Sequence, residues 1–252
     1  MRFDVITLFP ELFPAFLSAG VTRRAFESGQ VEVKLWNLRD FAQGSYRRVD
    51  DRPFGGGPGM VLLAEPLHQC LLRIQSERAD TAPVVLFSPI GEPLRQAVVQ
   101  RWSGSGGAVL VCGRYEGLDQ RFIDVHVTHQ ISLGDFVLSG GEVAAMALLD
   151  AVARLQPGVL HDADSHAQDS FSPALDGLLD CPHYSRPESW QGRAVPPVLL
   201  SGHHVQIERW RRDQRLQLTA LQRPDLVSAA RAARRLSTAD EASLAQTQKN
   251  PL

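Results

Sequence analysis

The chain has 252 residues, of which 44% are hydrophobic and 21% charged, and its formal net charge is −2, a balance typical of a globular protein. Its length allows one large domain, or one domain with an appendage. No apolar run approaches membrane-spanning length, residues 1–8 lack the pattern of a signal peptide, and three scattered cysteines are too few for a disulfide framework. We therefore expect a protein of the reducing cytoplasm with no membrane partner.

Strand and helix patterns alternate over the first 155 residues. Strands are predicted over residues 2–9, 31–36, 83–88, 108–112 and 125–131, and helices over 11–28 (interrupted near Gly20), 64–76, 92–102, 119–124 and 142–155, with a single turn at 38–41. Such alternation favours an α/β layer with a mostly parallel sheet. Strands that are apolar throughout, such as 108–112, predict that both faces of the sheet are covered.

A long loop, Gly44–Gly59, interrupts this alternation. Its first part is highly charged and its second part, Pro53–Gly59, is rich in glycine and proline, which excludes a helix or a central strand. The loop is too long for a simple connector, so we interpret it as a mobile functional loop. It lacks the Gly-Lys-Ser/Thr ending of a P-loop.

Glycines follow three of the predicted strands, at Ser88–Gly91, Gly113–Gly117 and Leu133–Gly141. Ligands of open α/β sheets bind beyond the carboxyl ends of strands, so the three segments predict one pocket. Gly140 and Gly141 open a helix, where unpaired amides and close backbone approach suit a small polar ligand. The alternative is a plain strand-to-helix turn. No segment has the Gly-x-Gly-x-x-Gly spacing of a dinucleotide site.

The last third of the chain differs in composition. Residues 157–175 read as an acidic linker, followed by irregular proline-rich segments and helices over 203–221, 225–236 and 238–246. Between His203 and Arg235 there are eight arginines and three acids, a net charge of about +5. Such a segment suggests a polyanionic partner, the alternative being a solvated helical surface.

Other residues carry weaker chemical signals. No set of histidines and cysteines has the spacing of a zinc site, so we expect no metal ligands. Cys112 ends an apolar strand and is expected to pack in the core. Asp135 and Glu142 flank glycine turns and are expected to hold the local backbone.

Seven motifs together resemble those of bacterial tRNA (guanine-N1)-methyltransferases of the SPOUT superfamily. The motifs are Phe9–Phe13, Pro53–Met60, Cys112–Gly117, Ser132–Glu142, Asp169–Phe171, Leu179–Tyr184 and Pro196–Gly202. Each is weak alone, but their order and spacing cover nearly the whole chain. Residues 161–164 and the C-terminal tail depart from the pattern.

The resemblance implies a SPOUT domain over residues 1–160 with a deep trefoil knot, a flexible linker over 161–175, and a small helical tRNA-binding domain over 176–252. Without the resemblance we would not expect a knot, because chain connections that thread through a loop are rare in proteins. The resemblance also implies a homodimer with active sites shared between subunits. The reaction would be methylation of N1 of guanosine 37, immediately 3′ of the tRNA anticodon. The methyl donor would be S-adenosyl-L-methionine, with a possible Mg²⁺ requirement that we assign to no residue.

The resemblance also assigns site residues. The cofactor would contact Pro89, Gly113, Tyr115, Glu116, Ile131, Leu133, Gly134, Asp135, Phe136, Val137, Leu138, Gly140 and Gly141. Asp169 would be the general base, and Arg154 would stabilise charge growing on guanine O6.

Three expectations follow for experiment. Valine at Gly113 or Gly141 should abolish cofactor binding without unfolding the chain. Arg209, Arg212 and Arg215 should contact tRNA phosphates. The 44–59 loop should be disordered until tRNA binds and then fold over the target base.

Two alternatives to a methyltransferase stay open at this level. A non-catalytic RNA-binding protein would explain the basic segment but leave the glycine pocket without a role. A nucleotide-binding metabolic enzyme would explain the pocket but not the arginines. Titration with S-adenosyl-L-methionine and then with tRNA distinguishes the three.

Overall fold

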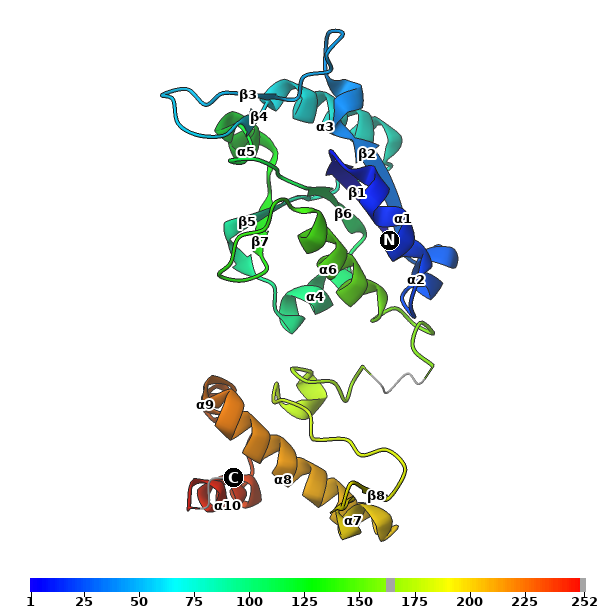
Figure 1. The fold of residues 1–252 in the computed structure, drawn as a ribbon, viewed down its shortest axis with the longest axis vertical. Coiled ribbons are helices and arrows are strands. Elements are labelled where there is room, and N and C mark those ends of the chain that lie inside the picture. Colours follow the sequence, from blue (N-terminus) through cyan, green and yellow to red (C-terminus); the bar gives the residue numbers. More distant parts are fainter. Residues whose placement is uncertain (162–165, 250–252) are drawn as a thin grey trace. The chain divides into compact units, whose positions relative to one another are not determined.

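The computed structural model describes residues 1–161 and 166–249, which fall into two compact units, residues 1–161 and 162–252 (Figure 1). Residues 162–165, within the predicted linker, lie outside the described residues. Among the helices of the described residues, none has the length and apolar character needed to cross a bilayer.

The first unit is built on a five-stranded sheet in which every pair of neighbouring strands is parallel. Its strands are β1 (Arg2–Thr7), β2 (Glu32–Asn37), β5 (Val84–Pro93), β6 (Gly107–Val111) and β7 (His129–Ser132), in the order β2-β1-β6-β5-β7. Two short strands pair in antiparallel fashion: β3 (Asp50–Asp51), which lies within the predicted loop, and β4 (Val61–Leu62), which follows it. The prediction of an α/β fold with a mostly parallel sheet is confirmed.

Helices cover both faces of this sheet (Figure 1). One core contains residues of α1 (Phe13–Ser18), α2 (Arg23–Glu27), α4 (Gln96–Ser103) and α6 (Glu142–Ala153); the other contains residues of η2 (Leu38–Phe41), α3 (Ala64–Glu77) and α5 (Gln120–His126). A short turn, η1 (Pro10–Leu12), precedes α1. In β6, Ala108 and Leu110 pack in the first core, whereas Val109 and Val111 pack in the second. Alternate side chains of a strand point to opposite faces, which explains why this strand is apolar at every position.

The predicted boundaries around residue 90 are wrong. The strand expected to end at Ser88 continues to Pro93, and the helix expected from Glu92 begins at Gln96. The register against β7 shifts between Phe87 and Glu92, so β5 leaves the ladder and rejoins it. A Cβ atom at Gly91 would lie 2.4 Å from the Ile131 amide nitrogen, which explains the glycine at this close approach.

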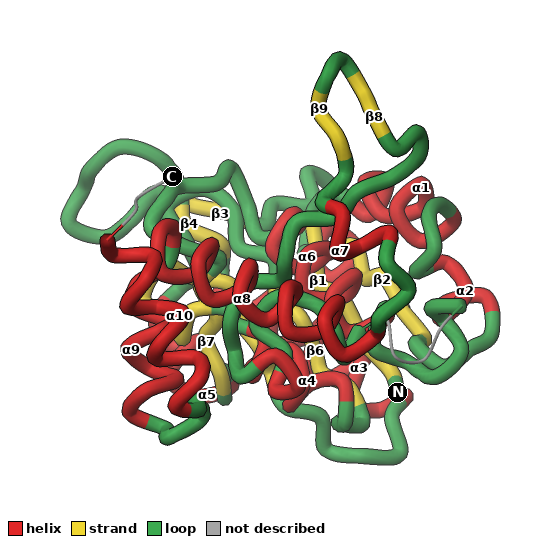
Figure 2. The backbone as a smooth tube through the Cα atoms, turned by 90° about the horizontal axis from the view of Figure 1, so that it is seen from below, coloured by secondary structure: helices red, strands yellow, loops and turns green. Residues whose placement is uncertain are grey.

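The second unit is mainly helical. It contains η3 (Pro173–Leu175), a hairpin of β8 (Ser189–Trp190) and β9 (Arg193–Ala194), α7 (Pro197–Leu200), α8 (His204–Gln222), α9 (Pro224–Ala232) and α10 (Thr238–Lys249). The hairpin projects from the helices of this unit (Figure 2). A small core joins α8, α9 and α10 through Leu216, Val227 and Leu244.

Three arginines of α8 form ion pairs inside this unit. The pairs are Arg209–Asp213, Arg209–Asp240, Arg212–Asp176, Arg212–Asp240 and Arg215–Asp180. Arg215 is buried, and the Nη1 atom of Arg212 lies 2.8 Å from Asp176. We therefore assign these arginines a structural role, in place of the phosphate contacts expected from the charge pattern.

Candidate active site

A cavity of about 390 Å³ lies where the second half of β5 meets the ends of β6 and β7 and the segments that follow them. All three glycine-bearing segments contribute to its lining. Of the residues expected to contact a cofactor, Asp135 is not in the lining, and the others line the cavity: Pro89, Gly113, Tyr115, Glu116, Ile131, Leu133, Gly134, Phe136, Val137, Leu138, Gly140 and Gly141. The structure thus brings together residues that are far apart in the sequence.

One wall of the cavity presents apolar side chains to solvent. Phe136, Val137 and Leu138 follow one another in the lining and are all exposed. Neighbouring exposed apolar groups in a concave site mark a ligand surface, because a bound apolar group removes them from water.

The glycines hold the other walls together. The Gly141 amide donates to the Gly113 carbonyl at 2.9 Å, and Arg114 and Gly140 form a β-bridge. A Cβ atom at Gly141 would lie 2.8 Å from the Cys112 Cα atom. Gly141 is therefore required for packing α6 against β6, and valine there would disturb the fold. This close contact argues against the expectation that Gly141→Val acts on ligand binding alone.

A buried polar network lies behind these walls. The Glu142 side chain is 1% exposed; its Oε1 accepts a hydrogen bond from Thr7 Oγ1 at 2.8 Å, and its Oε2 lies 2.9 Å from Arg114 Nη2. Arg114 Nη1 donates to the Ser139 carbonyl at 3.2 Å. The expectation that Glu142 holds the local backbone is wrong, because its partners are side chains on β1 and on the segment after β6.

This network is not fully hydrogen-bonded. Arg114 Nε and Glu142 Oε2 are buried without a hydrogen-bond partner among the described residues, so the contact between the two side chains is an ion pair without hydrogen-bond geometry. The Arg114 guanidinium also lies over the Phe9 ring, 4.5 Å from its centroid. Arg114 was not expected to have a role. The sequence feature that could have indicated the pair is an arginine directly after Gly113 and a glutamate directly after Gly141.

The 44–59 loop reaches the cavity through Glu116. The Glu116 amide donates to the Met60 carbonyl at 3.0 Å, and a Cβ atom at Gly59 would lie 2.3 Å from Glu116 Oε1. Farther out, Tyr46 and Phe54 are fully exposed. The base of the loop is therefore fastened to the pocket wall, while its apolar side chains face solvent.

Neither of the two expected catalytic residues is in the lining of this cavity. Arg154 follows the last turn of α6 and is absent from the cavity lining. Since α6 has 12 residues, it extends about 18 Å from the pocket end to the Arg154 end. Asp169 belongs to the second unit, where its carbonyl accepts a hydrogen bond from the Ser172 amide. Their catalytic roles stay predictions.

The cysteines are buried and free. Burial raises the pKa of the Cys112 thiol well above its usual value, and the nearby Glu142 carboxylate raises it further. Burial likewise raises the pKa values of Cys70 and Cys181. The thiols are therefore protonated at neutral pH, which disfavours a nucleophilic role.

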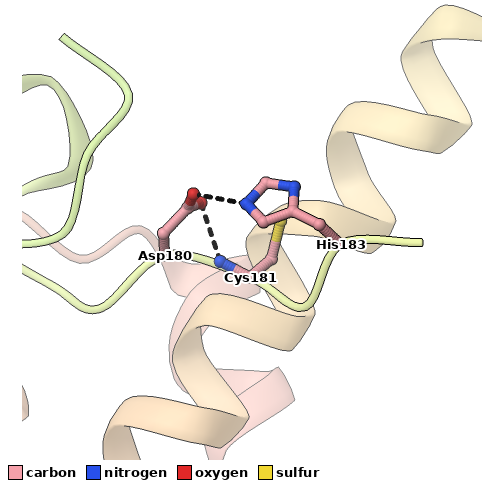
Figure 3. Close-up of side chains that lie close together, drawn as sticks. All are labelled: Asp180, Cys181 and His183. Atoms are coloured by element: carbon pink, nitrogen blue, oxygen red, sulfur yellow. Dashed lines mark hydrogen bonds and ion pairs between the residues drawn. The ribbon is translucent and has the colours of Figure 1, made fainter. Parts of the chain in front are cut away.

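One group of potential metal-ligating side chains occurs among the described residues: Asp180, Cys181 and His183 (Figure 3). Asp180 accepts hydrogen bonds from His183 Nε2 at 2.8 Å, the Cys181 amide at 2.7 Å and Arg215 Nε at 3.2 Å. Burial alone would raise the pKa of Asp180, but these hydrogen bonds lower it. We interpret the group as an anchor for the segment that follows it.

Comparison with known proteins gives consistent results over the whole chain. The model of the family described as tRNA (Guanine-1)-methyltransferase TrmD matches residues 1–229. A protein of Albidiferax ferrireducens named tRNA (guanine-N(1)-)-methyltransferase is 75% identical over 245 residues, covering 97% of this chain and 99% of the relative. Proteins with the same name from Polaromonas sp. strain JS666 (73% identity, 100% and 98% coverage) and Bordetella pertussis (56% identity, 97% and 97% coverage) are also similar.

Proposed function

Because the chain belongs to the tRNA (guanine-1)-methyltransferase family and is a methyltransferase that acts on guanine N1 of tRNA, we propose that its target is guanosine 37, immediately 3′ of the anticodon. The observation that carries this function is the family match over residues 1–229, together with relatives that align over nearly their full length. S-adenosyl-L-methionine supplies the methyl group, and we place it in the cavity formed by β5 and the segments that follow β6 and β7.

The cavity suits this methyl donor. Its volume of about 390 Å³ falls within the ~300–1,000 Å³ of small-molecule sites. The exposed faces of Leu133 and Leu138 would cover an adenine ring, and backbone groups near Gly113 and Gly140 would bond its polar edges. Glu116, also in the lining, offers a carboxylate to a positively charged ammonium or sulfonium group.

Transfer to N1 requires removal of a proton from guanine. N1 of guanine carries a weakly acidic proton, and the nitrogen becomes a competent nucleophile as a base removes that proton. We assign this step to the carboxylate of Asp169. Negative charge then grows on guanine O6, where the guanidinium of Arg154 would stabilise it.

We further propose that the enzyme is a homodimer with shared active sites. Arg154 and the cavity lie at opposite ends of α6, about 18 Å apart along its axis. This separation within one chain favours a site completed by a second chain.

Three further proposals follow from the family. The chain forms the deep trefoil knot of SPOUT enzymes around the cavity, and the enzyme acts on tRNA in the cytoplasm. It also requires magnesium, so EDTA would inhibit methyl transfer.

The test of function is methyl transfer to an unmodified tRNA transcript, followed by mapping of the methylated base. We expect N1-methylguanosine at position 37. In Asp169→Asn we expect fold and donor affinity to be kept and nearly all turnover to be lost. Substantial turnover by this variant would remove Asp169 from the role of base.

A mixing experiment tests the shared site. Neither the Asp169→Asn nor the Arg154→Ala homodimer should be active, and mixed dimers should regain activity if each site takes these two residues from different chains. Mixed dimers that form without regaining activity would contradict the shared site and leave the base assignment intact.

A further inference from the structure

A second cavity, of about 410 Å³, lies within the second unit. It is enclosed by the segment 182–188, helix α7 and residues of α8. Its volume is that of a small-molecule site, and none of the groups discussed for methyl transfer lines it.

Two aromatic side chains, Tyr184 and Trp210, line this cavity. Their ring centroids are 6.2 Å apart and their planes are tilted by 57°, so the rings do not cover each other's faces. Tyr184 is 49% exposed although it borders the cavity. Aromatic faces of this kind are where unstacked nucleobases bind.

Two arginines, Arg186 and Arg211, line the same cavity. Among the described residues, the Arg186 side chain has no ion pair or hydrogen bond, and Arg211 pairs only with Glu208 on the helix surface, at 2.6 Å. An exposed pair of this kind contributes little and is easily replaced by a phosphate contact. The cavity lining also includes Glu188, whose carboxylate would repel a phosphate but accept a hydrogen bond from a base amino group. This pattern favours a base inside the cavity and its phosphates at the rim.

The wall that carries Tyr184 and Arg186 is held at both ends. At its start, Asp180 accepts a hydrogen bond from His183 (Figure 3). It also accepts one from Arg215 of α8. At its end, the Val195 amide donates to the Glu188 carbonyl at 2.8 Å. A wall fixed before binding loses little conformational entropy when the ligand enters.

We propose that this cavity binds an unstacked nucleobase of the tRNA substrate, other than the methylated guanine. Tyr184 and Trp210 contact the base, and Arg186 and Arg211 contact its flanking phosphates. The inference rests on the proposed function, because it takes tRNA as the ligand. Holding a second base fixes the register of the RNA, so the cavity contributes to the choice of target nucleotide.

The first test compares variants of the cavity with matched variants of the hairpin. Tyr184→Ala and Arg186→Gln change the cavity, whereas Trp190→Ala and Arg193→Gln change exposed side chains outside its lining. In filter binding with unmodified tRNA, we expect Tyr184→Ala to weaken affinity about 5- to 100-fold. Arg186→Gln should lower the slope of log affinity against log salt by about 1. The hairpin variants should bind like wild type.

The second test identifies the base. Unpaired nucleotides of the tRNA are replaced one at a time by abasic residues, and affinity is measured for wild type and for Tyr184→Ala. We expect one position, other than the target guanosine, at which the abasic change weakens wild type and leaves Tyr184→Ala unchanged.

Two results would overturn the inference: wild-type tRNA affinity in both cavity variants, or equal sensitivity of wild type and Tyr184→Ala at every abasic position. Both leave the proposed function standing as long as the wild-type enzyme methylates guanine N1. A wild-type enzyme that transfers no methyl group to tRNA would instead contradict the function itself.

Discussion

The ion pair between Arg114 and Glu142 predicts an asymmetric response to mutation. Arg114→Met removes the cation from a carboxylate that is 1% exposed, whereas Glu142→Gln removes the anion from an arginine whose side chain is 18% exposed. A buried charge without its partner is more costly than one that can reach water. Arg114→Met should therefore destabilise the first unit more than Glu142→Gln.

The structure sets the scale of both effects. Breaking a buried ion pair costs about 3–5 kcal/mol, which we expect for Arg114→Met. For Glu142→Gln we expect about 1–3 kcal/mol, because the glutamine can still accept from Thr7 and Arg114 still donates to Ser139. For a unit of this size, the larger loss lowers the melting temperature by roughly 6–20 °C.

Urea and thermal unfolding measure these losses, with the transitions of the two units fitted separately. Arg101→Met is the control, because it breaks the exposed Arg101–Glu92 pair (2.6 Å) and should cost under about 1 kcal/mol. The double variant Arg114→Met/Glu142→Gln should be more stable than Arg114→Met alone, since no buried charge remains. The reasoning is refuted if the single losses match that of the control, or if they simply add in the double variant.

Three further predictions concern other parts of the chain. Burial alone would raise the pKa of Asp240, but hydrogen bonds from Arg212 and the Ser237 amide lower it to about 2. Since the folded pKa is below the unfolded one, the free energy of unfolding of the second unit should fall by about 2 kcal/mol as pH drops from about 5 to 1. Urea denaturation over a pH series measures this loss, and Asp240→Asn should not show it. Arg212→Ala should lower the unfolding midpoint of this unit without changing the salt dependence of tRNA binding, and a flatter salt slope would restore the phosphate role. Gly141→Val should lower the melting temperature of the first unit. Gly113→Ala should keep the fold, because its Cβ would meet only leucine methyls, the nearer at 3.0 Å, and it should weaken donor binding measured by calorimetry. Equal melting temperatures for the two variants would contradict the packing argument.

The elements of the first unit follow from the sequence where one physical rule dominates. The strand predicted over 108–112, found at Gly107–Val111, was predictable because a run of apolar residues suits a strand covered on both faces. The extension of β5 through Pro89 to Pro93 was not, because prolines and a glycine normally end a strand. Only the pairing with β7 across a register shift explains it, and that pairing is a long-range contact.

Some of the residues around the cavity could also be predicted from the sequence, and others could not. Glycines after strands indicated the three segments, because their conformational freedom can be read from the residue type. Arg114 and Glu142 could not be paired from the sequence, since neither composition nor spacing states which buried charges meet. A count of charges over α8 could not show that Asp176 and Asp240 lie beside its arginines.

The pocket and the expected base depend on different parts of the molecule. The cavity walls are fastened to the end of β1 by the bond between Thr7 and Glu142, which joins residues 135 positions apart in the chain. Asp169 belongs to the other unit, where Ser172 and Leu178 fix the backbone around it. If the donor binds in this cavity and Asp169 is the base, as we propose, donor binding should depend on assembly of the parallel sheet, and placement of the base on the second unit. Changes in one should leave the other intact, so loss of donor affinity and loss of turnover can be traced to separate structural causes.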